Sequence, residues 1–171
     1  MKIGVRHRTL DNPPVRGDAV NVFVAEHGIR VLIDPAATGV AEAEGFWPDK
    51  RIVVGVRFLR MNFNCQMATL LHEAWHCKAL HKEAKLLAMI ALSPLMLCPT
   101  LFLRVMRKVF AWTEFAADAY AARRGHGLAM IEVVMSGREA TGVLDFHPSN
   151  ESRVANIQRV MKGVNYVAPV L

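Results

Sequence analysis

The sequence contains few of the features that mark secreted, repetitive or nucleic-acid-binding proteins. Its 171 residues include only three cysteines, Cys65, Cys77 and Cys98, which form no even set and no CxxC pair. The first residues, MKIGVRHRTLDNPPV, contain no apolar stretch of the kind found in a secretory signal. We therefore expect a reducing, cytoplasmic environment, with all three cysteines buried as small apolar residues.

No run of basic residues is long enough to form a nucleic-acid-binding arm, although the formal net charge is +6. The Lys and Arg residues are scattered, which is typical of a solvated surface. Net charge alone permits attraction to anionic lipid or nucleic acid, so DNA binding stays a distant alternative and no nucleic-acid partner is expected. Internal repeats and low-complexity segments are also missing. The length fits a single domain over residues 1–171.

After one short helical pattern, extended patterns come next along the chain and further helical patterns follow. Apolar spacing predicts a helix from Asp18 to Gly28, with a hairpin turning at Glu26–Gly28 as the alternative. Runs rich in β-branched residues predict strands over Ile29–Ile33 and Arg51–Val56, joined by an Ala/Gly-rich loop. Further helices are expected over about residues 64–81, 104–124, 128–135 and from Ser149 or Asn150 to Gly163. The sequence thus predicts an α+β fold, with a small N-terminal sheet followed by a helical core.

The stretch "TLLHEAWHCKAL" contains two histidines four residues apart, with a glutamate directly after the first. On a helix these histidines lie on one face, so His72 and His76 can both bind one ion at about 2.0–2.1 Å. Glu73 would lie beside the ion, where it could accept a proton from a metal-bound water. This H-E-x-x-H spacing is typical of zinc metalloproteases. Two surface histidines that share a helical face are the alternative.

A zinc site of this kind needs a third protein ligand, and the neighbouring residues do not supply one. Metzincins carry Gly and His three and six residues after the second histidine, where this chain has Ala and Lys. His81 would lie about half a turn off the face of the histidine pair, and Glu83 would lie about 10 Å beyond it on a continuing helix. The next acidic residue downstream is Glu114.

Glu114 and Asp118, in "WTEFAADAYAA", are four residues apart and share one helical face. Glu114 can complete a site of two histidines and one glutamate. Asp118 can accept a hydrogen bond from the second ring nitrogen of a ligating histidine and orient that ring. The surrounding alanines allow this helix to pack closely against the histidine helix. An acidic pair on the surface of an alanine-rich helix is the alternative.

Three segments, in this order, resemble the gluzincin metalloproteases of the HtpX/Ste24 type, which include the CAAX prenyl proteases. "LLHEAWH" is similar to the family's HExxH helix, "EFAADAYAA" to its E-x-x-x-D helix, and "HPSNESRVANI" to its later His-Pro segment. Upstream, "KRIVVGVRFLRMNFNCQMATLL" is similar to the strand and helix entry before the metal helix. The family's Asn-Ala-Phe-Ala segment has only a loose counterpart in Ala41–Phe46, and its long N-terminal membrane spans have none.

The resemblance implies a zincin-like fold in which Glu73 is the general base and Zn²⁺ is bound by His72, His76 and Glu114. It also implies that His147 and Arg153 lie near the scissile carbonyl, where they could stabilise the tetrahedral oxyanion. For His147, an ordinary loop histidine is the alternative. The strand Arg51–Val56 would be the edge that pairs with an extended peptide.

An uncharged apolar segment, Leu86–Leu103, separates the two halves of the predicted site. A single membrane crossing would place the histidines and the glutamate on opposite sides of the bilayer. Two crossings need about 40 residues, whereas only 37 separate His76 from Glu114. Pro94 and Pro99 also interrupt the segment. We therefore expect an inserted apolar hairpin over residues 84–110. It would be buried in the core, shallowly inserted into a membrane from the cytoplasmic side, or docked on a partner, and the basic residues at its ends suit the membrane.

The sequence therefore predicts a zinc metalloendopeptidase that cleaves protein or peptide substrates, in the cytoplasm or peripherally at a membrane. From another functional class, the alternative is a catalytically idle zinc-binding module that regulates or docks partners through the apolar hairpin. A different HExxH lineage of regulator-cleaving proteases is a further alternative, against which the matches at Asp118, His147 and Arg153 argue.

Overall fold

The computed structural model describes residues 18–137 and 147–163 of the chain. Residues 1–17, on which the expectation of no secretory signal rests, lie outside these ranges. In chain order the elements are α1 (Asp18–His27), β1 (Arg30–Ile33), β2 (Ala41–Glu44), β3 (Arg51–Val54), α2 (Val56–Leu59), α3 (Phe63–Lys78), α4 (His81–Ala91), the 3-10 turn η1 (Ser93–Leu97), α5 (Pro99–Ala121), the π-helical turn η2 (Ala122–His126), α6 (Gly127–Ser136) and α7 (Asn150–Met161). The predicted α+β class, with a small sheet first and helices after, is confirmed.

The three strands form one sheet in the order β1, β3, β2. β1 pairs with β3 in parallel and β2 pairs with β3 antiparallel, with Ala43 opposite Ile52. Because β3 is the central strand, the expectation that Arg51–Val56 offers a free edge to a peptide is wrong. The edge next to the histidine helix is β2, where the sequence predicted only a loop. Its residues, AEAE, have little intrinsic strand preference, and the strand forms because β3 provides a partner.

The helices follow the predicted order and differ from the prediction mainly at their ends. α1 is a helix and not a hairpin, and Gly28, with φ of 67°, follows its last turn. α3 ends at Lys78, earlier than predicted, because Leu80 has a left-handed φ of 52° that no helix can continue through. α5 begins at Pro99, earlier than predicted, since proline at the first helical position needs no hydrogen-bond acceptor.

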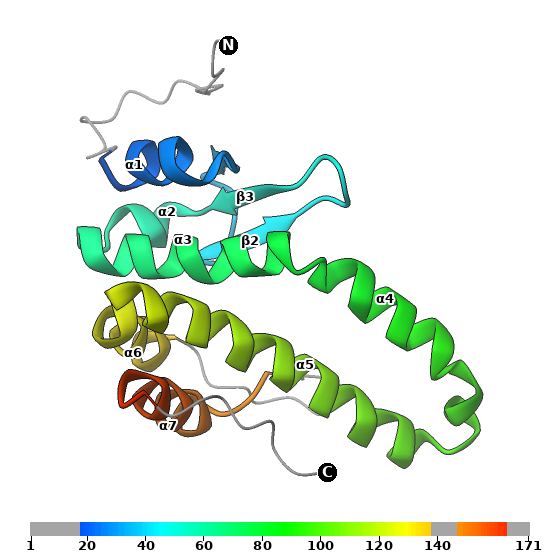
Figure 1. Cartoon of the computed structure of the whole chain (residues 1–171). Helices are drawn as coiled ribbons and strands as arrows, with labels where there is room; N and C mark the ends of the chain where they lie inside the picture. The colour runs from blue at the N-terminus through cyan, green and yellow to red at the C-terminus, as the bar shows by residue number, and fades with distance from the viewer. Residues whose placement is uncertain (1–17, 138–146, 164–171) are drawn as a thin grey trace.

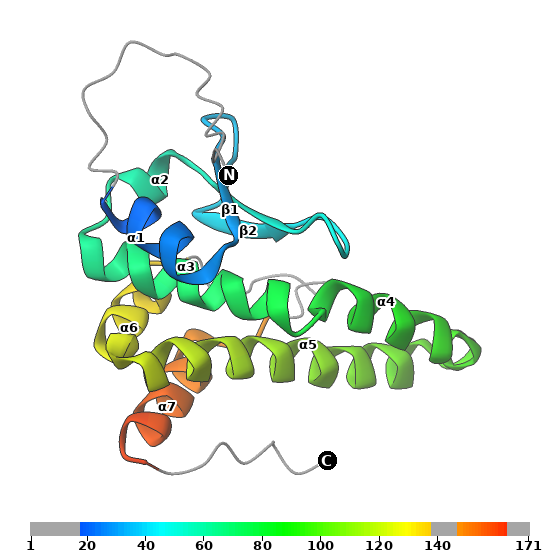
Figure 2. The same ribbon diagram turned by 45° about the horizontal axis from the view of Figure 1, so that its top comes forward.

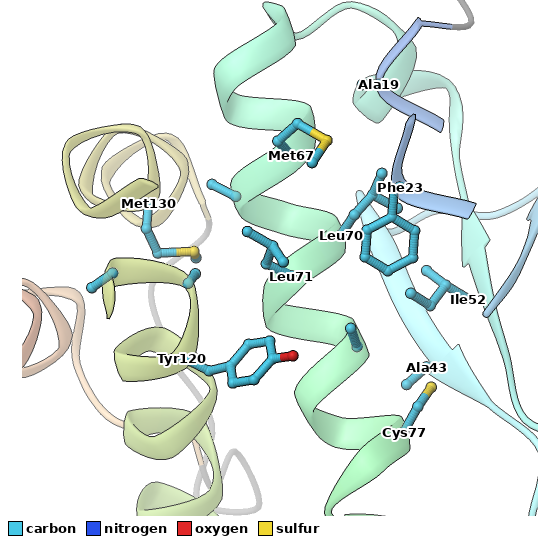
Figure 3. Packing of buried hydrophobic residues seen from close by; sticks show 14 of the residues in the cluster. Ala19, Phe23, Ala43, Ile52, Met67, Leu70, Leu71, Cys77, Tyr120 and Met130 are labelled. Carbon is cyan, nitrogen blue, oxygen red and sulfur yellow. The ribbon is translucent and has the colours of Figure 1, made fainter. Parts of the chain in front are cut away.

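α3 passes through the centre of the molecule and determines where the site lies. The side chain of Asn62 caps its start by accepting a hydrogen bond from the backbone N–H of Cys65 at 2.9 Å. Leu70 and Leu71 are both buried in the core; Figure 3 shows Leu70 next to Phe23, and Leu71 on the side of α3 that faces Tyr120. α3 thus packs between α1 and the sheet on one side and α5 and α6 on the other (Figure 1). Each such buried side chain stabilises the fold by about 1.5–3 kcal/mol.

α4 and the first half of α5 leave this body together as a helical hairpin, closed by η1 (Figures 1 and 2). Most of its large apolar side chains are exposed, so of the three alternatives for this hairpin the one that buries it in the core is wrong. Cys98 at its tip is exposed too, which corrects the prediction of three buried cysteines, whereas Cys65 and Cys77 are buried. No helix in residues 18–137 or 147–163 combines the length and the apolar character needed to cross a membrane.

Candidate metal centre

Three side chains from α3 and α5 converge on one point. Nε2 of His72 lies 3.2 Å from Nε2 of His76 and 3.3 Å from Oε2 of Glu114. Nε2 of His76 lies 3.5 Å from Oε1 of Glu114. A tetrahedral zinc ion that binds its ligands at about 2.0–2.1 Å separates the ligand atoms by roughly 3.3–3.4 Å. We call this group of three side chains the triangle. Its edges, which end on two different oxygens of the Glu114 carboxylate, are close in length to the edges of a zinc tetrahedron, and its two imidazoles and one carboxylate are ligand types that zinc prefers.

The packing of α3 against α5 brings these ligands together. The spacing of four residues stacks the two histidines on the face of α3 that looks towards α5. On α5, Ala117 and Ala121 are fully buried, and their small side chains allow the two helices to approach closely. His72 and Glu114 are buried as a result, so a bound ion would have protein on most sides.

Behind the triangle, Asp118 connects the histidine helix to α7. Its Oδ1 accepts a hydrogen bond from Nδ1 of His72 at 2.9 Å, the arrangement that the sequence predicted for this pair. The guanidinium of Arg153 donates from Nε to Oδ2 at 2.8 Å and from Nη2 to Oδ1 at 2.7 Å. This bidentate pair has Asp118 fully buried and Arg153 mostly buried. The Arg153–Asp118 pair thus fixes the orientation of the His72 ring, so that its Nε2 faces His76 and Glu114.

The position of Arg153 differs from the one that the family resemblance implies. Both of the guanidinium nitrogens named above are engaged by Asp118, and Arg153 does not line the cavity in front of the triangle. Its contact with the triangle is therefore indirect, through Asp118 and His72. The physical reason is that α7 packs against α5, which places Arg153 behind the metal ligands.

The site strongly favours a positive charge at His72. Burial, the largest influence, lowers the pKa of this residue, but hydrogen bonds to Asp118 and Glu114 outweigh it and raise the pKa to about 10. Burial also acts to raise the pKa of Glu114, but hydrogen bonds to His147 and His72 hold it well below the usual range. Two buried carboxylates are thus ionised around one imidazole. A divalent cation at the triangle would satisfy the same demand for positive charge.

Glu73 lies beside the triangle and not within it. Its Oε2 accepts a hydrogen bond from the backbone N–H of Ala43 in β2 at 2.8 Å, which fixes the carboxyl group at the wall of the cavity. Burial, as the main cause, raises the pKa of Glu73 to about 7. A carboxyl group with such a pKa can both take up and release a proton near neutral pH.

His81 is a residue of this centre that the sequence did not predict. Its Nδ1 lies 2.7 Å from Nδ1 of His76, and its ring is buried beside Trp75 and Trp112. Burial, followed by the charge of Lys85, lowers the pKa of His81 to about 4, so the ring is neutral and can accept the proton of His76 Nδ1. His81 therefore orients the ring of His76 through Nδ1, as Asp118 orients the ring of His72. The left-handed turn at Leu80, which sequence spacing does not reveal, brings it there.

A cavity of about 650 Å³ opens in front of the triangle. Strand β2 and its preceding loop form one wall, and the first turns of α4 form another. His147 also lines the cavity, with Nδ1 3.6 Å from Oε2 of Glu114 and a side chain that is more than half exposed. Glu83 does not reach the site. Its carboxylate accepts hydrogen bonds from Lys50 and from the backbone N–H of Trp47.

No family model, no curated protein and no solved structure matches this chain. The resemblance to the HtpX/Ste24 proteases therefore stays a prediction from the quoted motifs.

Proposed function

We propose that this protein is a zinc-dependent metalloendopeptidase of the gluzincin type. One observation carries the proposal: ring nitrogens of His72 and His76 and the carboxylate of Glu114 lie close enough together to bind one ion, and Glu73 lines the same cavity beside them. A structural zinc site would have four protein ligands and no cavity in front of it, whereas three ligands and an open side are typical of catalytic zinc.

Each side chain of the centre has a separate task in peptide hydrolysis. Zinc bound by the triangle would supply a Lewis acid that polarises the peptide carbonyl and acidifies a water molecule. Glu73, oriented by the N–H of Ala43, takes a proton from the attacking water and passes it to the nitrogen of the leaving amine. His147 lies at the edge of the cavity, where its ring can donate a hydrogen bond to the developing oxyanion.

The position of β2 favours an extended peptide as the substrate. β2 lines the cavity along Ala41–Glu44, and among residues 18–137 and 147–163 it pairs on one side only, with β3. Residues alternate in the direction of their backbone groups along a strand, so some groups of β2 are directed away from β3, as the N–H of Ala43 is towards Glu73. A peptide that adds to this edge as a strand would bring a carbonyl group past the triangle.

The decisive variant is Glu73→Gln, which keeps the size of the side chain but cannot take up a proton. We expect peptide cleavage to fall by at least about 100-fold, while zinc content by atomic absorption stays at the wild-type level. Glu26→Gln serves as a matched control, since Glu26 is an exposed residue on α1. Cleavage by Glu73→Gln at the wild-type rate would contradict the mechanism.

A catalytically idle zinc-binding module is the second candidate, because the exposed hairpin offers a surface for docking. Zinc binding that is lost in Glu114→Ala, together with no turnover across a broad peptide library, would favour this candidate. Zinc affinity that is unchanged in Glu114→Ala would contradict both functions. We place either function in a reducing compartment such as the cytoplasm, supported by the three free thiols, one of them exposed at Cys98.

A further inference from the structure

The tip of the hairpin formed by α4, η1 and α5 exposes a continuous set of large apolar side chains. Leu97 is 96% exposed, Leu87 66%, Met96 62% and Ile90 61%. Leu86, Met89 and Leu101 are exposed on the same two arms. Within the described residues the two arms pack against each other near the tip and no other element covers it (Figures 1 and 2). Exposed apolar side chains clustered in this way mark a surface that binds something.

Beyond Glu83 in the first turn of α4, the charges of the hairpin are all of one sign. From residue 84 to residue 113 the chain has no acidic residue, and its charged residues are Lys85, Arg104, Arg107 and Lys108. The three on α5 are exposed, and they begin where the apolar tip ends. At the base of α4, Lys82 and Lys85 lie 3.7 Å and 3.9 Å from the carboxylates of Glu42 and Glu114, so the basic residues that a partner would meet are the exposed ones of α5. A second copy of this tip would bring like charges together, so the surface favours an anionic partner.

The dimensions of the apolar tip match a shallow insertion. At about 1.5 Å per helical residue, the arms extend roughly 7–9 Å from the tip before they reach Lys85 on α4 and Arg104 on α5. Apolar faces of interfacial helices insert about 5–10 Å into the boundary of headgroups and acyl chains. The hydrocarbon core of a bilayer is about 30 Å thick, so this hairpin can anchor in one leaflet only.

We propose that the hairpin tip docks the protein on an anionic membrane surface. The side chains around Leu97 enter the outer part of one leaflet, and Arg104, Arg107 and Lys108 contact the lipid phosphates. Each Lys or Arg near an anionic surface adds to binding, and the effect weakens with salt. This inference concerns the hairpin alone and does not depend on the peptidase proposal, so Glu73→Gln should bind membranes as the wild type does.

Co-sedimentation of the full chain with vesicles tests the proposal. We expect binding to vesicles of phosphatidylcholine mixed with phosphatidylglycerol to be at least about tenfold stronger than to phosphatidylcholine alone, and to weaken as salt is raised. Leu97→Glu should reduce this binding about tenfold or more. Leu128→Glu is the matched control, because Leu128 is 73% exposed on α6 and the change in charge is the same. It should alter binding by less than about twofold.

The exposed thiol of Cys98 allows a second measurement at the tip itself. Because Cys65 and Cys77 are buried, an environment-sensitive fluorophore can be attached selectively to Cys98 in the folded protein. We expect a blue shift on addition of anionic vesicles, and quenching by lipids that carry a quencher near the headgroup more than by lipids that carry it at the bilayer centre.

Three results would overturn the proposal. The first is the absence of vesicle binding, and the second is equal binding to neutral and anionic vesicles. The third is vesicle binding that Leu97→Glu leaves unchanged. If vesicles are not bound but Leu97→Glu dissociates an oligomer in analytical ultracentrifugation, the tip is a protein interface and the membrane proposal is wrong. Since Leu97 is almost fully exposed, a thermal unfolding curve like that of the wild type should show that the variant is folded.

Discussion

The two halves of α5 lie in opposite environments. The first half belongs to the hairpin and exposes apolar and basic residues, among them Leu101 and Arg104. The second half is packed against α3 and α7, and it buries two acidic residues, Glu114 and Asp118. Hydropathy alone would place these residues the other way round. The comparison shows that burial in this molecule follows the available partners: the acids are buried because histidine, arginine and a metal can bind them, and the leucines are exposed because nothing described here covers them.

The largest effect that we expect from this comparison is on folding stability. Arg153→Ala leaves the buried carboxylate of Asp118 without its bidentate partner, and it should lower the free energy of unfolding by about 3–5 kcal/mol. Urea denaturation of the metal-free protein measures this change. Arg104→Ala removes an arginine from the exposed half of α5 and should change the stability by less than about 0.5 kcal/mol. If Arg153→Ala proves equally harmless to stability but lowers turnover, the substrate-facing role that the family resemblance implies is right.

A smaller effect is expected at the boundary between the two regions. His81→Phe removes the acceptor for Nδ1 of His76 while it keeps an aromatic ring between the two tryptophans. Loss of such a partner should weaken zinc binding about 10–100-fold. Competition with a chromogenic chelator measures the affinity. His126→Phe, in η2 at the far end of α5, should leave it unchanged. Equal affinities in the two variants would show that His81 does not support the metal.

The smallest effect, counted per pH unit, is a dependence of zinc affinity on pH. A ligating histidine must be neutral, and in the metal-free protein the pKa of His72 is raised to about 10, whereas that of His76 is held well below its usual value. Zinc must therefore displace a proton from His72 at neutral pH, so binding strengthens as the pH rises, by about tenfold per unit between roughly pH 6 and 8. Calorimetry in buffers of different protonation enthalpy counts this proton. The Glu73→Gln background removes any contribution from Glu73.

The Asp118→Asn variant tests whether the raised pKa of His72 causes this pH dependence. It removes a carboxylate charge that raises the pKa of His72, so fewer protons should be released when zinc binds. A zinc affinity that does not depend on pH in the unmodified protein would contradict the electrostatic description of the site.

Local patterns predicted those parts of the site that depend on one helix at a time. The spacing of His72 and His76, and that of Glu114 and Asp118, follow from helical geometry and could be recognised in the sequence. The α+β class could also be predicted, because runs of β-branched residues precede runs with helical spacing.

The features that sequence reasoning missed depend on tertiary contacts. β2 is a strand only because β3 lies beside it, and the same pairing makes β3 central. Leu80 ends the histidine helix in a conformation that leucine rarely adopts, so neither the end of the helix nor the position of His81 could be predicted from propensity. Arg153 faces Asp118 because of the way α7 packs on α5.

The hairpin is a place where residues could be inserted or deleted without moving the two helices that it connects. It leaves the body at the end of α3 and returns along α5, and direct contacts between these two helices hold its ends together. The entropy of closing a loop rises only slowly with its length, so residues could be added to or removed from the tip at little cost to the ligand positions. The number of residues between the two helices of the candidate metal centre is therefore free to vary, whereas the spacing of four residues within each helix is not.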